Sequence, residues 1–192
     1  MRWRGSVVLL AVPLVVQPAD MRARAWDALR SHVRDEHVLN HSLAVEAIMH
    51  EFATPKTDDA DEWAVAGLLH DIDVAATGND LSRHGLVAAP LLRALGFSEA
   101  VVHAVSAHDD HAGVPRRSRM DHGLYCADQV YWLIKDSGVS LPAAADAVWR
   151  KAQSMPWKAD TVKKTSGECA EIGLTMPRAF EAALAGMRKA SR

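Results

Sequence analysis

The chain has 192 residues, of which 49% are hydrophobic, and this length suits one domain with a sizeable core rather than two full domains. Its 22 basic and 24 acidic residues leave a formal net charge of -2. No summed positive field is therefore available to hold a nucleic acid backbone, so a nucleic acid polymer is not a favoured partner.

The N-terminal segment resembles the start of a secretory signal, because two arginines precede an apolar run over residues 7–16. This run is too short to span a bilayer stably. A cleavage site is poorly specified, since Gln17 stands where a small residue is needed. We therefore expect residues 1–20 to be an extension, residues 21–192 to form the domain, and the protein to be cytoplasmic. Export or anchoring through residues 1–20 is the alternative.

Helix-spaced apolar stripes recur after residue 20, whereas no window of strict apolar and polar alternation stands out. The fold class is therefore predicted to be all-α. Ser82 is expected to cap one helix that Gly96 ends, and Ser98 is expected to cap the next. The first six helices are expected at residues 21–34, 36–53, 61–71, 83–95, 98–108 and 120–137.

Three further helices are expected at residues 141–153, 158–173 and 176–190. Pro142 and Pro177 would lie in first turns, where the missing N–H of proline is harmless. These helices either cover the core or form the surface of a homodimer. We prefer core packing, and the homodimer stays open as the alternative.

The two cysteines, Cys126 and Cys169, lie far apart in the sequence and form no paired motif. This pattern fits a reducing compartment and excludes a zinc site made of thiolates. Any metal ion is then expected to be held by nitrogen and oxygen atoms.

Imidazole and carboxylate side chains recur on apolar helix faces, where an uncompensated polar group is costly. His70 and Asp71 close an apolar run over residues 63–69. The other members of the set share helix faces with apolar neighbours at spacings of three and four residues: His41, His84, His108 and Asp128.

A lone histidine on an apolar face is more often a satisfied core residue than a metal ligand. Six such positions on one chain are harder to explain in this way. Burying several imidazoles and two carboxylates without compensation would cost roughly several kcal/mol each, and a divalent cation removes that cost for all of them together. We therefore interpret the six residues as one site.

The sequence around these positions resembles that of the HD-domain superfamily of metal-dependent phosphohydrolases, particularly small stand-alone members. The resemblance lies in Asn40-His41-Ser42, Leu68-Leu69-His70-Asp71-Ile72, His84-Gly85 and Ala107-His108, and covers roughly residues 36–136. It implies a single compact helical bundle with additional C-terminal helices. By analogy, His41, His70, Asp71 and Asp128 would hold one metal ion, and Asp71 would bridge to a second ion held by His84 and His108.

Departures from the family pattern bear on the substrate. Asp73 replaces a common glycine, and Val74 stands where many members carry lysine, so no role of that lysine carries over. The absence of a following Gly-Tyr-Pro sequence argues against the cyclic-dinucleotide phosphodiesterase branch. A second histidine often follows the ligand at His108, but here Asp109 does, so His103 or His111 stays open as the ligand instead.

A site of six nitrogen and oxygen ligands leaves open coordination positions, which suits two divalent ions such as Mn, Fe, Mg, Co or Ni. Two cations that share a carboxylate can activate water and support phosphoryl displacement. The leading hypothesis is hydrolysis of a phosphate ester of a small molecule or nucleotide, with Asp71 central to catalysis. Asp109 or His111 is the candidate for protonating the leaving group.

Four arginines flank the ligand segments and are candidates to receive phosphate oxygens. Their alternative role is that of solvated loop residues. They are Arg83, Arg116, Arg117 and Arg119.

Two other functions stay open from the sequence. Some HD-domain proteins resemble this chain in ligand set and use two irons and dioxygen to cleave C–C or C–P bonds, which the ligand pattern does not separate from hydrolysis. The other is a non-catalytic regulatory module that binds metal, against which the complete ligand set argues.

Overall fold

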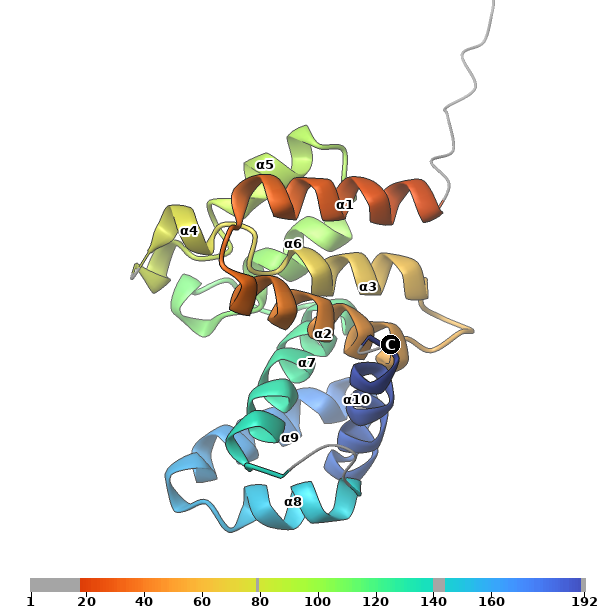
Figure 1. Ribbon diagram of the computed structural model, residues 1–192, viewed down its shortest axis with the longest axis vertical. Coiled ribbons are helices and arrows are strands. Elements are labelled where there is room, and N and C mark those ends of the chain that lie inside the picture. Colours follow the sequence, from red (N-terminus) through yellow and green to blue (C-terminus); the bar gives the residue numbers. More distant parts are fainter. Residues whose placement is uncertain (1–17, 79, 140–143, 191–192) are drawn as a thin grey trace, which may run out of the picture.

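The computed structural model describes residues 18–78, 80–139 and 144–190, and every regular element in these ranges is a helix, which confirms the predicted all-α class (Figure 1). The α-helices are α1 (Pro18–His32), α2 (Glu36–Phe52), α3 (Ala60–Leu69), α4 (Val74–Thr77), α5 (Ala88–Ala94), α6 (Glu99–Ala107), α7 (Arg119–Asp136), α8 (Ala145–Gln153), α9 (Ala159–Glu171) and α10 (Met176–Ala190). Short 3₁₀ helices are η1 (Leu81–Arg83), η2 (Asp110–Ala112) and η3 (Pro156–Lys158).

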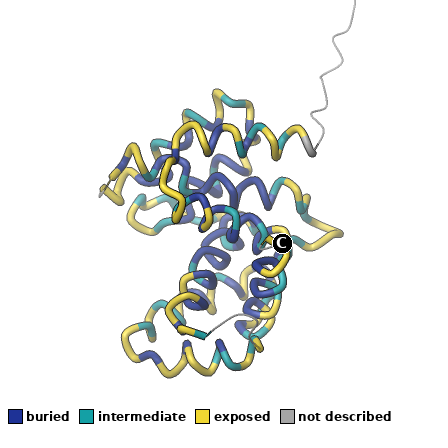
Figure 2. The backbone as a smooth tube through the Cα atoms, viewed as in Figure 1, coloured by how far each residue is buried: buried dark blue, intermediate teal, exposed yellow. Residues whose placement is uncertain are grey.

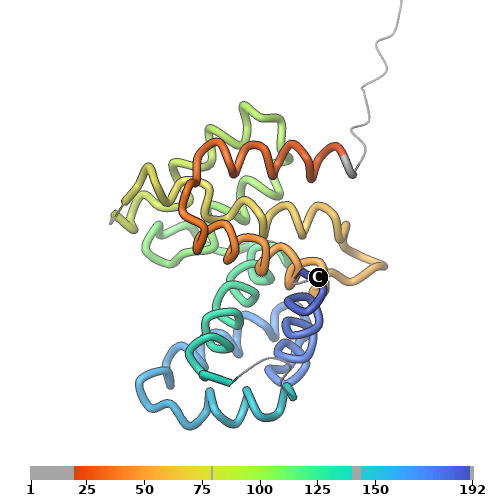
Figure 3. Tube along the Cα trace, viewed as in Figure 1, coloured from red at the N-terminus to blue at the C-terminus, as the bar shows by residue number. Residues whose placement is uncertain are grey.

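Helix α2 is central, because α3, α7 and α10 all pack against it. Two glycines permit this close packing. A Cβ on Gly67 of α3 would lie 2.7 Å from the carbonyl oxygen of Val45, and a Cβ on Gly186 of α10 would lie 2.6 Å from that of Ala47. In Figure 3, α10 runs back toward the end of α2, where Lys189 bonds to Glu51 at 2.6 Å.

The core runs through the inward sides of α2, α3, α6, α7 and α10, which are dark blue in Figure 2. All residues from Trp63 to Leu69 are buried. The apolar run thus makes α3 an interior helix, and the pair His70-Asp71 at its end is held inside the protein rather than on its surface.

The prediction of one helix over residues 83–95 is wrong in its first half. Helix α5 begins at Ala88, and the backbone N–H of Ala88 donates to Asp73 Oδ2 at 2.9 Å. Ser82 caps nothing there, because it lies in η1 and bonds to Asp80. The predicted stop at Gly96 is confirmed, as Gly96 has a positive φ of 77° and its N–H donates to the Arg93 carbonyl.

The predicted cap at Ser98 is also confirmed, since its hydroxyl accepts from the N–H of Val101. Pro177 lies in the first turn of α10 as predicted. The predicted start at residue 141, with Pro142, lies outside the described residues. Helices α9 and α10 pack against α7 and α2, so the C-terminal helices contribute to the core.

The two cysteines are joined, although the sequence shows no paired motif and was interpreted as typical of a reducing compartment. Cys126 of α7 and Cys169 of α9 form a disulfide, and both are fully buried. The inference of a reducing compartment rested on unpaired cysteines and loses that support. In the described part of the chain, no helix has both the length and the apolar character needed to cross a membrane.

Candidate metal centre

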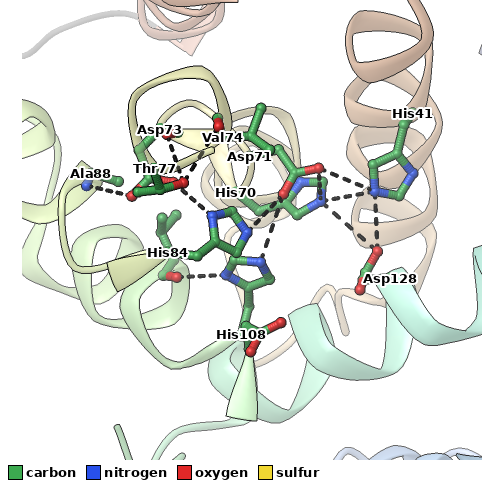
Figure 4. A network of polar contacts seen from close by, with 12 residues as sticks. His41, His70, Asp71, Asp73, Val74, Thr77, His84, Ala88, His108 and Asp128 are labelled. Carbon is green, nitrogen blue, oxygen red and sulfur yellow. Dashed lines mark hydrogen bonds and ion pairs between the residues drawn. The ribbon is translucent and has the colours of Figure 1, made fainter. Parts of the chain in front are cut away.

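Six side chains from five segments converge on one interior point (Figure 4). Three of the histidines occupy equivalent local positions, since each is the residue that directly follows a helix: His70 after α3, His84 after η1 and His108 after α6. His41 and Asp128 project from within α2 and α7. Asp71, next to His70, lies between all the others.

On one side of Asp71, its Oδ2 atom faces two imidazoles. Oδ2 lies 3.3 Å from His70 Nε2 and 3.6 Å from His41 Nε2. The two Nε2 atoms are 3.0 Å apart. Asp128 completes this group, with its Oδ1 atom 3.1 Å from His41 Nε2 and 3.9 Å from His70 Nε2.

On the other side, the Oδ1 atom of Asp71 faces a second pair of imidazoles. It lies 3.0 Å from His84 Nε2 and 3.8 Å from His108 Nε2. The rings of His84 and His108 meet edge to face with centroids 4.7 Å apart. The two oxygens of one carboxylate therefore serve two separate groups of ligand atoms.

The opposite ring nitrogens of three histidines are held by acceptors outside the centre. His70 Nδ1 donates to the Gly67 carbonyl at 2.8 Å, and His108 Nδ1 donates to the Val105 carbonyl at 2.7 Å. His84 Nδ1 donates to the carboxylate of Asp73 at 2.8 Å. When Nδ1 carries the proton, Nε2 offers a lone pair to the interior, which is how metal-binding histidines are oriented.

The mutual electrostatics of the cluster shift the pKa values of its members. Burial opposes the charged form of each group, but the neighbours outweigh it in most of them: the carboxylates raise the pKa of His70, and three imidazoles hold that of Asp71 well below its ordinary value. Asp71 and Asp73 raise the pKa of His84 to about 10. For His108, burial and the charges of His70 and His84 lower the pKa.

The residues present fit divalent cations. Two sets of three ligand atoms each lie within 4.8 Å of one another, His41 with His70 and Asp71, and Asp71 with His84 and His108. The Oδ1 atom of Asp128 is buried and has no hydrogen-bond donor among the described residues. A buried carboxylate oxygen without a donor next to two imidazole nitrogens is poorly accommodated by protein contacts alone and well accommodated by a metal ion.

The other histidines considered as ligands lie apart from the two sets. His103 bonds through Nδ1 to Asp121 Oδ2 at 3.0 Å. His111 is 63% exposed and bonds through Nδ1 to Asp109 Oδ1 at 2.8 Å. His108 is therefore the member of the histidine-rich segment that joins the cluster, while Asp109 and His111 form a pair just beyond it, at η2.

Two of the four candidate arginines have internal partners. Arg116 bonds to Asp110, Glu168 and the Ala107 carbonyl. Arg119 bonds to Asp58 and Thr54. Arg83 and Arg117 have exposed side chains for which no ion pair occurs in the described ranges.

Sequence reasoning missed two polar residues that hold the site's surroundings together. Asp73 was identified only as a replacement for glycine, although its carboxylate holds both His84 and the start of α5. Glu168 of α9 accepts from Arg116 and lies 2.6 Å from His122 Nδ1, and so ties α9 to the loop after His108. No local pattern points to either partner, because both contacts join distant segments.

Comparison with known proteins matches the model of the HD domain to residues 38–131. The chain is 32% identical over 95 residues to ribonuclease Y of Oleidesulfovibrio alaskensis, covering 50% of this chain and 18% of that protein. It is 36% identical over 73 residues to ribonuclease Y of Chloroflexus aurantiacus, covering 38% and 14%. An uncharacterized protein of Methanocaldococcus jannaschii is 33% identical over 94 residues, covering 46% and 54%.

The chain thus spans less than a fifth of the length of these ribonuclease Y proteins and about half of the third relative. The matched segment of the family model begins three residues before His41 and ends three residues after Asp128, so it includes all six clustered residues. No solved structure matches the chain.

Proposed function

The chain belongs to the HD-domain family through residues 38–131, and on this basis we propose that it hydrolyses a phosphate ester of a small molecule or nucleotide at a centre of two divalent metal ions. One observation carries the proposal. The Oδ2 atom of Asp71 faces His41 and His70, while its Oδ1 atom faces His84 and His108.

This arrangement suits phosphoryl displacement. Two divalent cations sharing a carboxylate lower the pKa of a water between them and stabilise both the attacking and the leaving oxygen. His41, His70, Asp71 and Asp128 would hold one ion, and Asp71, His84 and His108 the other. The low pKa of Asp71 keeps its carboxylate charged at neutral pH, as a bridging ligand must be.

Two groups near the ligands would complete the chemistry. Arg83 directly precedes His84 and is exposed, so we assign it to the phosphate oxygens in preference to Arg116 and Arg119, whose guanidinium groups already have carboxylate partners. We assign protonation of the leaving group to His111, which is exposed and held through Nδ1 by Asp109.

A small substrate is favoured over an RNA chain. Ribonuclease Y is by its name an enzyme of RNA, but the present chain aligns with less than a fifth of those proteins. The formal net charge of -2 supplies no general attraction for a polyanion. Arg116 and Arg119 are already paired with carboxylates, so they add little positive charge that could attract an RNA backbone.

The test is a phosphatase assay on protein loaded in turn with Mn, Fe, Mg, Co or Ni. The panel contains nucleotides, sugar phosphates and a short RNA. Phosphate release from a small substrate, lost in His41→Ala, His70→Ala and Asp71→Ala, is the expected result. His37→Ala is the matched control for His41→Ala, because His37 lies one turn earlier on the same helix and is exposed.

Two outcomes would contradict the proposal. One is oxygen consumption that depends on Fe(II) and a substrate, with no phosphatase activity in any metal form, which would indicate a di-iron oxygenase. The other is metal binding without either activity, which would indicate a regulatory module. Cleavage of RNA with no release from small phosphates would overturn the assigned substrate class while leaving hydrolysis in place.

A further inference from the structure

One face of α7 carries both a proposed metal ligand and a large exposed aromatic side chain. Tyr125, Asp128, Trp132 and Lys135 follow one another at spacings of three, four and three residues, which places them along one side of the helix. Trp132 is 44% exposed, although it belongs to the helix that contributes most to the core. A single exposed apolar side chain is common on a protein surface, so the contacts of Trp132 with the proposed ligands decide its significance.

Trp132 lies directly against the metal centre. Its ring centroid is 5.1 Å from that of His41, with the planes tilted by 36°. Tyr131 lies on the same imidazole at 4.5 Å, and the two aromatic rings meet edge to face at 5.2 Å. Both rings therefore contact the imidazole of His41, and Trp132 is partly exposed beside this proposed ligand.

A cavity of about 370 Å³ lies between α2, α7 and α10, on the Tyr131 side of this pair, and neither Trp132 nor a proposed metal ligand lines it. Its lining includes Asn40, which precedes His41, together with Tyr131 and Lys135. Lys135 is exposed and forms no ion pair with any residue that the structure describes. Along α7, Trp132 thus places a ring beside His41, and Lys135 places an uncompensated positive charge one turn further from Asp128.

We propose that Trp132 and Lys135 form the subsite for the leaving group of the substrate, and that this group carries an aromatic ring and an anionic substituent. The ring would stack on Trp132 while the phosphate lies at the metal centre, and the anion would pair with Lys135. The inference rests on the proposed hydrolase function and narrows its substrate class to aromatic phosphate esters.

The proposal is tested with three matched substrates: phenyl phosphate, cyclohexyl phosphate and 4-carboxyphenyl phosphate. Because stacking on an aromatic side chain strengthens the binding of a ring, Trp132→Leu is expected to raise KM for phenyl phosphate about 5- to 10-fold with kcat little changed. Cyclohexyl phosphate has a similar size but no π-system, so its KM should stay within about twofold. Trp132→Phe should restore most of the loss.

Lys135→Met isolates the charge. It is expected to raise KM for 4-carboxyphenyl phosphate and to leave KM for phenyl phosphate unchanged.

Trp157→Leu is the matched control for Trp132→Leu. Trp157 is also an exposed tryptophan, at 76%, and it lies in η3, far in sequence from the ligand Asp128 of α7. The metal content of every variant is measured first, because a substitution at Trp132 that displaces His41 would lower the amount of bound metal.

Binding of phenylphosphonate and cyclohexylphosphonate to the metal-loaded protein, measured by calorimetry, separates this inference from the proposed function. If no phosphate ester is hydrolysed, the proposed function fails, yet the two phosphonates still report whether Trp132 prefers a ring. Equal effects of Trp132→Leu on both phosphonates, or no effect on either, would overturn the subsite. If Trp132 instead serves a protein partner, the variant leaves both affinities unchanged.

Discussion

Asp73 and His84 are joined by a hydrogen bond of 2.8 Å, donated by His84 Nδ1 to Asp73 Oδ1. The second oxygen of the same carboxylate accepts from the backbone N–H of Ala88, the first residue of α5. Asp73 is itself almost fully buried. The residue that departs from the common family pattern thus orients one proposed ligand and starts the helix beyond it.

Asp73→Asn should weaken binding at the proposed second metal position. An amide offers one acceptor where the carboxylate offers two, so either His84 or Ala88 loses its partner. Loss of such an outer partner typically lowers metal affinity about 10- to 100-fold. Competition with a chelator measures the change, and Asp80→Asn on the exposed loop serves as the control. Unaltered affinity in Asp73→Asn would show that His84 needs no such support.

Ligand substitutions should separate the two proposed metal positions. His84 Nε2 faces the Oδ1 atom of Asp71 and belongs only to the group of ligand atoms on that side, so His84→Ala is expected to keep one ion and lose the other. Asp71→Ala removes the carboxylate shared by both groups and should lose both ions. Elemental analysis of the purified variants gives the ratios directly. Equal ratios in the two variants would contradict the bridging role of Asp71.

The metal-free protein should lose stability as pH rises. Burial lowers the pKa of His84, but hydrogen bonds to Asp71 and Asp73 outweigh it and raise the value to about 10 from an ordinary 6.5. Between these values the folded chain holds a proton that the unfolded chain has released. The free energy of unfolding therefore has its full contribution below pH 6.5 and loses it as pH rises through about 10.

Denaturant unfolding across this pH range measures the effect. His84→Gln should flatten the dependence, because it removes the titrating group. Metal-loaded protein should also lack it, since a bound ion requires the neutral imidazole and displaces the proton. A slope that is identical in the wild type and in His84→Gln would assign the effect to other groups.

The disulfide between Cys126 and Cys169 should contribute substantially to stability. It joins α7 to α9 across a sequence separation of 43 residues, and closing a loop of this length stabilises a folded chain by about 2–4 kcal/mol. A variant with both cysteines changed to serine should show this loss in denaturant unfolding. The wild type in a dithiol reductant should approach the variant, whereas the variant should not respond to the reductant.

Local signals in the sequence were sufficient for most of the helices, although not for the start of α5, and for the six residues that the structure brings together. The stop at Gly96 and the cap at Ser98 act through neighbours within five residues, so they are readable without a fold. His41 and Asp128 are identifiable because helical periodicity states which side of a helix faces the core. The cost of burying these polar groups joined the separate positions into one site, the family resemblance then implied two metal positions, and the structure brings the six residues together.

The tertiary structure decided how those groups pair. Asp73 had no assignable partner in the sequence, because His84 comes within reach only when the turn after α3 folds back beside η1. The disulfide between Cys126 and Cys169 has no signal in the sequence, because the two residues come together only when α9 packs on α7. The physical reason is the same in each case: periodicity and capping act within a few residues, whereas these contacts depend on how whole helices are placed against one another.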